Sequence, residues 1–178
     1  MSNLGKVSVF LGMVINHHPS TGPQDISQGR YVWSILEHFG MMNCNPAITL
    51  GERTLHPHNP LLRTEDAKMY QELVGSLNYL LPTCTRSDIS FTVMQLSHLM
   101  GKPAAPSLSA AKQLFRYLKG TMDLPLHYNK CTTFNLMGLA DASYGRIPGN
   151  GRTVSGFIFT LSGAAIMVIQ GLTDRGCI

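Results

Sequence analysis

The sequence predicts an α+β fold in which a helical middle region separates an N-terminal β-hairpin from three C-terminal strands. Residues 7–15 are rich in β-branched and other apolar side chains, as strands are. Between residues 27 and 119 the apolar residues recur at helical spacing. After residue 133 they occur in short β-rich stretches separated by glycine turns. This change of period along the chain is the main evidence for the fold class.

The N-terminal hairpin is expected to begin with one strand over residues 7–15. The segment 17–24 contains Pro19, Gly22 and Pro23, which favour a turn. Ile26 is then expected near the end of the second strand, which closes the hairpin.

The first helix is expected to begin near Ser27 and to stop at Gly40. Its apolar face consists of Tyr31, Val32, Ile35, Leu36 and Phe39. The segment 43–62, which contains three prolines and one glycine, predicts an extended connector without a regular element.

The second helix is expected to begin at Thr64, whose hydroxyl can cap it, and to end at Pro82. Glu65 and Asp66 follow this cap, where the positive end of the helix dipole favours acidic residues. Their position therefore explains this acidic pair without a metal site.

Two more helices follow, and they share an apolar stripe pattern with the second. One has Ser87 or Asp88 as its cap and stops before Gly101, and the other covers residues 107–119 and ends at Gly120. The stripes of the three helices are Met69, Leu73, Leu77, Leu80, Ile89, Val93, Leu96, Met100, Leu108, Ala111, Phe115 and Leu118. Residues 134–140, 153–161 and 164–169 then predict three strands.

The composition favours a folded protein over a disordered chain. The 178 residues suffice for one ordinary domain or two small ones, and 44% hydrophobic residues can supply a core. Only 13% of the residues are charged, which suggests that some apolar surface meets a partner. The net charge of +4 is compatible with nucleic acid but does not require it.

The four cysteines are spaced by 40 residues or more, so neither a zinc knuckle nor a disulfide framework is expected. The N-terminus lacks a signal-peptide pattern, and the longest apolar run, 164–169, is too short to cross a membrane. We therefore expect an intracellular protein, in the cytoplasm or the nucleus, without a membrane partner.

Lys112, Arg116 and Lys119 follow i, i+4, i+7 spacing, so their cationic ends share one face of the last helix. No acidic residue occurs from 89 to 122 to neutralise them. Such a row can lie along a phosphate backbone and gain affinity by counterion release. The alternative is an ordinary solvated helix face.

Asp141 follows an apolar, strand-like run, which is how some two-metal nucleases present their first metal ligand. No glutamate follows it, and the only later aspartate is Asp174. One carboxylate cannot fix two Mg²⁺ ions, because such sites need several protein oxygens. We expect Asp141 to hold a cation weakly, and we expect no catalysis by the isolated chain.

Other polar residues have simpler explanations than catalysis. Asp88 is favoured as a helix cap over a catalytic acid. His17, His18, His56 and His58 lie in proline-bearing loops without a cysteine or carboxylate at ligand spacing, so surface histidines are favoured over metal ligands. The chain contains no GxxxxGK[ST], GxGxxG, GxSxG or HExxH motif.

Several short strings, through their order and spacing together, resemble one family. They are FLGM at 10–13, FGMMNCNP at 39–46, VGSLNYL at 74–80, TRSDI at 85–89, RYLKGT at 116–121, DASY at 141–144 and RTVSGF at 152–157. Together they resemble the polyprotein of copia-type LTR retrotransposons, in its reverse transcriptase and ribonuclease H region. The resemblance covers nearly all of residues 4–169.

The resemblance implies a division of the chain. Residues 1–26 would be the end of the reverse transcriptase palm, and residues 27–122 a helical thumb and connection. Residues 123–170 would be a truncated ribonuclease H-like domain with its first three strands in antiparallel order, and 171–178 an unrelated tail. Asp141 would be a vestigial first ribonuclease H carboxylate. The thumb of this family holds the template–primer duplex, which gives the basic row an expected partner.

The departures from the family pattern concern the catalytic groups. The polymerase centre, a Tyr-x-Asp-Asp turn, has no counterpart here, and no Asp-Asp pair occurs. Ser87 replaces the proline of the family's TRPDI string, and Ser107-Leu108 replaces its His-Trp pair. The family's W-x-S-x-K-Q stretch is lost at 168–173. The parent family uses Mg²⁺, but no cofactor is expected in this chain.

The expected function is therefore that of a catalytically incomplete part of a retrotransposon polyprotein that contacts an RNA–DNA or DNA duplex. The parent activities are RNA-directed DNA synthesis and RNA–DNA hybrid cleavage, within an element that also integrates DNA. One alternative is a protein-interaction module that docks on an intact reverse transcriptase, and another is a non-functional genomic relic. An uncovered apolar sheet face, including Phe157, Phe159 and Ile166, is also expected.

Overall fold

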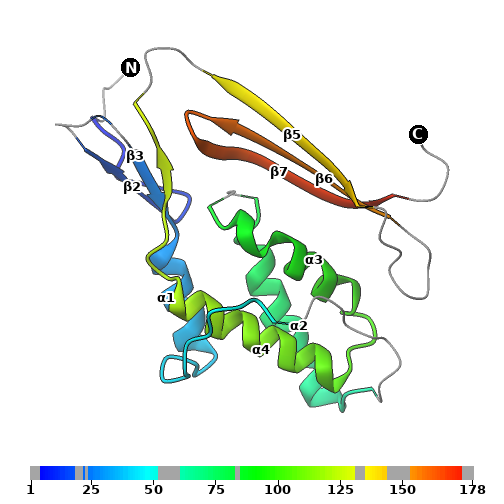
Figure 1. Cartoon of the computed structure of the whole chain (residues 1–178). Helices are drawn as coiled ribbons and strands as arrows, with labels where there is room; N and C mark the ends of the chain where they lie inside the picture. The colour runs from blue at the N-terminus through cyan, green and yellow to red at the C-terminus, as the bar shows by residue number, and fades with distance from the viewer. Residues whose placement is uncertain are drawn as a thin grey trace.

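The computed structural model describes residues 5–18, 22, 24–51, 61–82, 85–130, 135–143 and 153–173. These residues form four α-helices, one 3-10 helix and two antiparallel sheets, which confirms the α+β class. Figure 1 shows the helices as one group, with a small sheet at one end and a long three-stranded sheet across one side. No helix among the described residues is long and apolar enough to cross a membrane.

The small sheet contains four strands in the order β1-β2-β3-β4. They are β1 (Val9–Phe10), β2 (Met13–His17), β3 (Gln24–Ser27) and β4 (Leu126–Tyr128). The expected pairing across residues 17–24 is present as β2 against β3, with Ile15 opposite Ile26.

The expectation of a single strand over residues 7–15 is wrong. Leu11 and Gly12 have positive φ angles of 48° and 76°, so the chain reverses there and β1 pairs antiparallel with β2. Two consecutive residues with positive φ form the tight turn whose twist matches a hairpin. The turn was hidden because it lies inside an apolar run.

Strand β4 was not expected from the sequence. It pairs with β3, with Leu126 opposite Ile26, and so returns the chain from the last helix to the small sheet. The domain boundary expected at residue 123 stays a prediction, but β4 lies with the N-terminal strands.

The helices lie close to their expected positions. They are α1 (Gly29–His38), α2 (Thr64–Asn78), the 3-10 helix η1 (Ser87–Ile89), α3 (Ser90–His98) and α4 (Ala105–Gly120). The expected cap at Thr64 is wrong, because Arg63 is the N-cap of α2 and no side chain caps that helix. Glu65 and Asp66 do lie in its first turn, as expected.

One hydrophobic core joins the four helices. Every expected stripe residue of these helices is buried or packs against that core, and Tyr70, Val74 and Leu114 are further buried members. The Tyr70 hydroxyl donates a hydrogen bond to the Leu96 carbonyl at 2.7 Å, which satisfies the one polar atom of this buried ring. Burial raises the pKa of Tyr70.

The second sheet has the order β5-β6-β7, formed by β5 (Leu136–Ser143), β6 (Thr153–Leu161) and β7 (Ala164–Thr173). The bounds of β6 match the expected ones, whereas β5 and β7 are longer than expected. Ser162 and Gly163, with φ angles of 52° and 89°, make the turn between β6 and β7.

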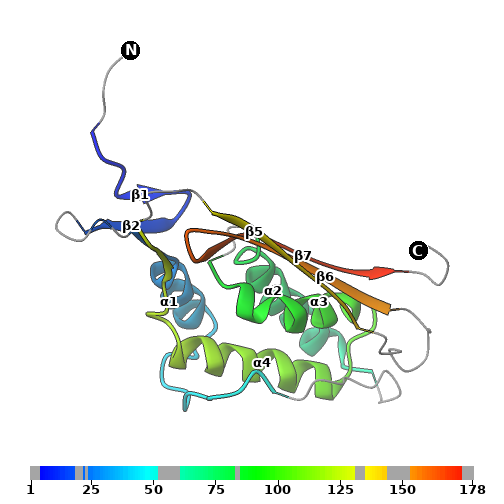
Figure 2. The ribbon, with the colours of Figure 1, turned by 45° about the horizontal axis from the view of Figure 1, so that its top comes forward.

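The second sheet lies over the helices, with β7 next to α3, as Figure 2 shows. The Tyr128 hydroxyl donates to the Ala165 carbonyl at 2.9 Å, and the Asn129 amide donates to the Ser162 carbonyl at 3.0 Å. These bonds connect the end of β4 to the turn and start of β7.

The three residues expected on an uncovered apolar face are exposed, and the strand pairing places Phe157 and Phe159 on one face but not Ile166, which is next to Met167, the partner of Phe159. Phe157, Phe159 and Ile166 are 45%, 37% and 42% exposed. Phe157 and Ile169 lie directly opposite each other in adjacent strands, so their side chains are on the same face of the sheet. Gly138 lies opposite Phe159, and a Cβ there would be 3.0 Å from the Phe159 ring, so the absence of a side chain makes room for it.

Candidate nucleic-acid interface

Arg86 joins η1 to the C-terminal end of α4. It is 2% exposed, and its Nη2 donates to Asp88 Oδ2 at 2.9 Å and to the Thr121 hydroxyl at 2.7 Å. Its Nη1 donates to the Thr121 carbonyl at 3.2 Å, and its guanidinium lies 5.6 Å from the centre of the Tyr117 ring. The TRSDI and RYLKGT strings therefore contact each other through one buried cation.

Asp88 is the charged partner of this arginine, and its expected role as a helix cap is wrong. Its carboxylate accepts bonds from Arg86 and, at 2.9 Å, from the Tyr117 hydroxyl, and no side chain caps η1 or α3. Burial raises the pKa of Asp88, but the hydrogen bonds and charge of Arg86 and the bond from Tyr117 outweigh burial. The net effect lowers the pKa of Asp88, which favours the ionised carboxylate. Burial, with the bond to Asp88, raises the pKa of Tyr117.

The basic row on α4 divides into one exposed cation and two half-buried ones. Lys112 is exposed, whereas Arg116 and Lys119 are half-buried. Arg116 Nε donates to the Asn45 carbonyl at 2.7 Å, and Lys119 Nζ donates to the Cys44 carbonyl at 2.6 Å. Two of the three predicted residues thus hold the 43–47 segment against α4, a role that the sequence analysis missed.

The backbone of the same segment also approaches α4 closely. The Ala47 amide donates to the Arg116 carbonyl at 3.1 Å. A Cβ on Gly120 would lie 3.2 Å from the Ala47 carbonyl oxygen and 3.3 Å from Pro46 Cβ. The FGMMNCNP and RYLKGT strings therefore also contact each other, and glycine at 120 allows this approach.

Arg116 and Lys119 keep further N–H donors after bonding to the carbonyls of the 43–47 segment. A guanidinium carries five N–H groups and an ammonium three. Arg116 uses further capacity on Gln113 Oε1 at 3.1 Å. Lys112 is exposed, as a phosphate contact requires. Substitution of Lys112 is therefore the most direct test of whether the basic row contacts nucleic acid.

Asp141 lies inside β5, opposite Gly156 of β6, and the strand continues two residues beyond it to Ser143. Its side chain is exposed, and it is the only acidic residue in the described parts of β5, β6 and β7. Within the described ranges, no three His, Cys, Asp or Glu side chains are placed to hold a metal ion together. The Mg²⁺ that the resemblance implies does not fit a single exposed carboxylate.

His17 and His18, at the end of β2, make hydrogen bonds within the protein. His17 Nε2 donates to the Val7 carbonyl at 2.9 Å. His18 Nε2 lies 2.9 Å from Asp25 Oδ2, and His127 Nδ1 of β4 lies 2.5 Å from Asp25 Oδ1. Hydrogen bonds from His18 and His127 lower the pKa of Asp25. His56 and His58 lie outside the described residues.

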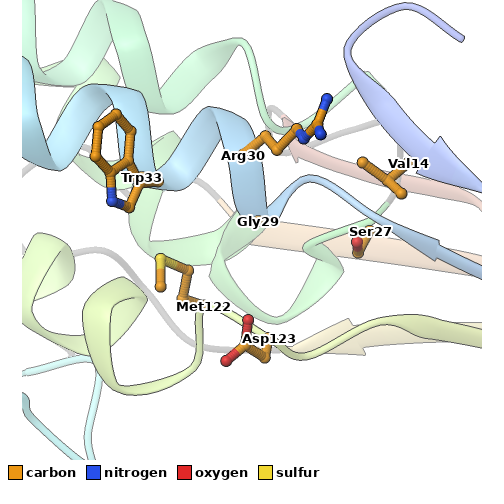
Figure 3. A pocket seen from close by; sticks show the side chains of 7 residues that line it. All are labelled: Val14, Ser27, Gly29, Arg30, Trp33, Met122 and Asp123. Atoms are coloured by element: carbon orange, nitrogen blue, oxygen red, sulfur yellow. The ribbon is translucent and has the colours of Figure 1, made fainter. Parts of the chain in front are cut away.

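An open pocket of about 520 Å³ lies at the junction of the small sheet with α1 and the end of α4. Figure 3 shows the residues around it, which are Val14, Ser27, Gly29, Arg30, Trp33, Met122 and Asp123. A second pocket of about 400 Å³ lies between α2, α3 and β7, and Ser90 and Val168 are among its lining residues.

The chain is similar to several curated proteins. It is 32% identical to the retrovirus-related Pol polyprotein from transposon TNT 1-94 of Nicotiana tabacum, over 93% of this chain and 13% of that protein. It is 32% identical to the Pol polyprotein from transposon RE1 of Arabidopsis thaliana, over 85% of this chain and 10% of that protein. It is also 32% identical to an uncharacterized mitochondrial protein of Arabidopsis thaliana, over 88% of this chain and 64% of that protein.

No family model and no solved structure matches the chain. The family assignment therefore rests on sequence relatives, which include retrovirus-related Pol polyproteins of transposons. The chain is related to a part of the Pol polyproteins of copia-type retrotransposons, as the resemblance predicted. It spans about a tenth of the Pol relatives and less than two thirds of the mitochondrial one.

Proposed function

We propose that this chain is the part of a retrotransposon polyprotein that holds a nucleic-acid duplex next to, but outside, the catalytic centres. In this proposal α1 to α4 correspond to the thumb and connection of a reverse transcriptase. Strands β5 to β7 correspond to the first three strands of a ribonuclease H-like domain. The observation that carries the proposal is the similarity to Pol polyproteins over most of the chain.

The basic row of α4 is the proposed duplex contact. Lys112 is exposed, and the sequence around the row from 89 to 122 contains no acidic residue to compete with phosphate for it. Arg116 and Lys119 are held in place by the 43–47 segment, which reduces the conformational entropy that they would lose on binding.

The test is a titration of a DNA duplex and of an RNA–DNA hybrid at several salt concentrations. Each phosphate contact contributes roughly −0.9 to the slope of log affinity against log salt, so Lys112→Ala should make the slope shallower by about 1. Lys68→Ala, which removes an exposed lysine from α2, is the matched control and should leave the slope unchanged. Equal effects of the two variants would contradict a duplex contact at this row.

The chain is proposed to have no catalytic activity of its own. Asp141 is exposed and has no acidic neighbour in the described strands, so it is expected to bind a cation weakly. Turnover of an RNA–DNA hybrid, or extension of a primer, by the purified chain would contradict this part of the proposal.

A second function, docking on an intact reverse transcriptase, is favoured by the apolar face of the second sheet. Phe157 and Phe159 expose 45% and 37% of their surface there. Co-purification with an intact reverse transcriptase after nuclease treatment, lost on Phe157→Ser, would favour docking over duplex contact.

A further inference from the structure

The open pocket at the start of α1 contains the only tryptophan of the chain, Trp33. Its side chain is 44% exposed, although a large aromatic ring is usually covered. The neighbouring helix residues Val32, Ile35 and Leu36 are buried in the core, so α1 is anchored without this ring. The exposed indole is therefore available to a ligand.

Arg30 precedes Trp33 by three residues on α1 and is exposed at the same pocket. Residues three apart on a helix lie on neighbouring turns of one face. Within the described ranges, no carboxylate lies at ion-pairing distance from the Arg30 guanidinium. Figure 3 shows Arg30 and Asp123 on opposite sides of the opening, so that the cation and the carboxylate lie apart.

We propose that this pocket binds an unpaired nucleotide of a single-stranded nucleic acid, with the base stacked on Trp33 and a phosphate at Arg30. An aromatic platform beside a cation is the combination that single-strand binding sites use. The volume of about 520 Å³ lies in the range of small-ligand sites. Asp123 can accept a hydrogen bond from the amino group of a base.

The ligand class rests on the proposed function, because similarity to Pol polyproteins makes nucleic acid the expected partner. The pocket is nevertheless separate from the basic row of α4. It uses an aromatic ring and one cation, whereas the row offers only cations to a duplex backbone. The two sites can therefore be tested with different ligands and different variants.

The experiment uses the intrinsic fluorescence of the full chain, since Trp33 is its only indole. Oligodeoxythymidylate is titrated into the protein, and the same mixture is followed by the anisotropy of a label on the oligonucleotide. The expected result is quenching of Trp33 emission that saturates together with the anisotropy, because a stacked base quenches an indole. A blunt duplex without unpaired nucleotides should bind without comparable quenching.

Two variants test the assigned roles. Trp33→Ala should weaken oligonucleotide binding, read by anisotropy, by roughly 10-fold or more, as loss of a stacked base does. Arg30→Ala should make the salt slope shallower by about 1, and Arg63→Ala, which removes an exposed arginine beside α2, should not. Circular dichroism checks that the variants fold, and Trp33→Phe, which keeps a ring, should retain part of the affinity.

Two further ligands test whether the pocket recognises a nucleic-acid strand, a free nucleotide or any polyanion. Thymidine monophosphate that quenches Trp33 with the affinity of the oligonucleotide would assign the site to a free nucleotide and overturn the role of the strand. Polyglutamate that binds as well would make Arg30 a general anion site and overturn the stacking role.

Absence of oligonucleotide binding, or binding with unchanged Trp33 emission, would also overturn the proposal. Duplex binding that still depends on Lys112 would then leave the proposed function intact. Quenching that depends on Arg30, without any effect of Lys112→Ala on the duplex, would support the pocket and count against the basic row.

Discussion

The helical unit and the C-terminal sheet treat their apolar side chains in opposite ways. In the core that joins α1 to α4, the buried apolar residues are at most 6% exposed. In the second sheet, apolar residues such as Leu136, Leu139 and Met167 are 62%, 56% and 47% exposed. Leu136 and Leu139 are three residues apart in β5 and therefore lie on opposite faces of the sheet. The difference shows that four helices can cover one another, whereas this sheet leaves apolar side chains exposed on both of its faces.

The strings that resemble the family also differ between the two regions in how many contacts their polar residues make within the protein. In the helical unit, the strings that carry the resemblance bond to one another, through Arg86 to Thr121 and through Lys119 to Cys44. In the sheet, Asp141 is exposed and has no acidic neighbour among the described residues of β5, β6 and β7. We infer that the stability of the chain is concentrated in the helical unit.

The largest expected effect follows from removing the buried cation of the helical unit. Arg86→Ala leaves Asp88 without its ion-pair partner and Thr121 without its donors. A hydrogen bond to a charged group typically contributes about 1.5–3 kcal/mol, so losing the bonds to Asp88 and to Thr121 together should lower the free energy of unfolding in urea by about 3–5 kcal/mol. Arg63→Ala, at an exposed position, should change it by less than about 0.5 kcal/mol. A loss of under about 1 kcal/mol for Arg86→Ala would show that the Arg86 contacts do not stabilise the unit.

A matched pair of leucine substitutions compares the two regions directly. Leu114 is 0% exposed and Leu139 is 56% exposed. Leu114→Ala should cost about 2–5 kcal/mol, because it leaves a cavity in the core. Leu139→Ala should cost less than about 1 kcal/mol. Equal losses in urea unfolding would mean that the sheet face is covered in solution, for example by self-association, which sedimentation would detect.

The helical part of the fold was predictable because its signals are local. An apolar period of about 3.6 residues indicates a helix whatever the rest of the fold is, and α1 to α4 lie close to where that period predicted them. Strand β4 has only three residues, and its pairing with β3 depends on contacts about a hundred residues away, as between His127 and Asp25. The sequence contains no local signal for such a strand.

The candidate site was only partly predictable for the same reason. The spacing of Lys112, Arg116 and Lys119 placed them on one helix, but Arg116 and Lys119 bond to carbonyls 71 and 75 residues away. Trp33 was missed as a site residue, although a single tryptophan outside the apolar face of its helix was a visible signal.

A smaller, pH-dependent effect is expected in the small sheet. Hydrogen bonds from His18 and His127 lower the pKa of Asp25 in the folded state. A lowered folded pKa adds stability above the unfolded value of about 3.9, and this stability is lost as the pH falls through the folded pKa. Asp25→Asn should therefore lower the melting temperature at neutral pH, and the difference from the native chain should shrink below about pH 4. A difference that is the same at all pH values would rule out the ionised Asp25 as its cause.

The most direct test of the account compares one charged residue from each region in the same duplex titration. We expect Lys112→Ala to make the salt dependence shallower by about 1, and Asp141→Asn to leave affinity, salt slope and Mg²⁺ dependence unchanged. The opposite result, with binding sensitive to Asp141 and Mg²⁺ but not to Lys112, would place the nucleic acid on the sheet and contradict the account.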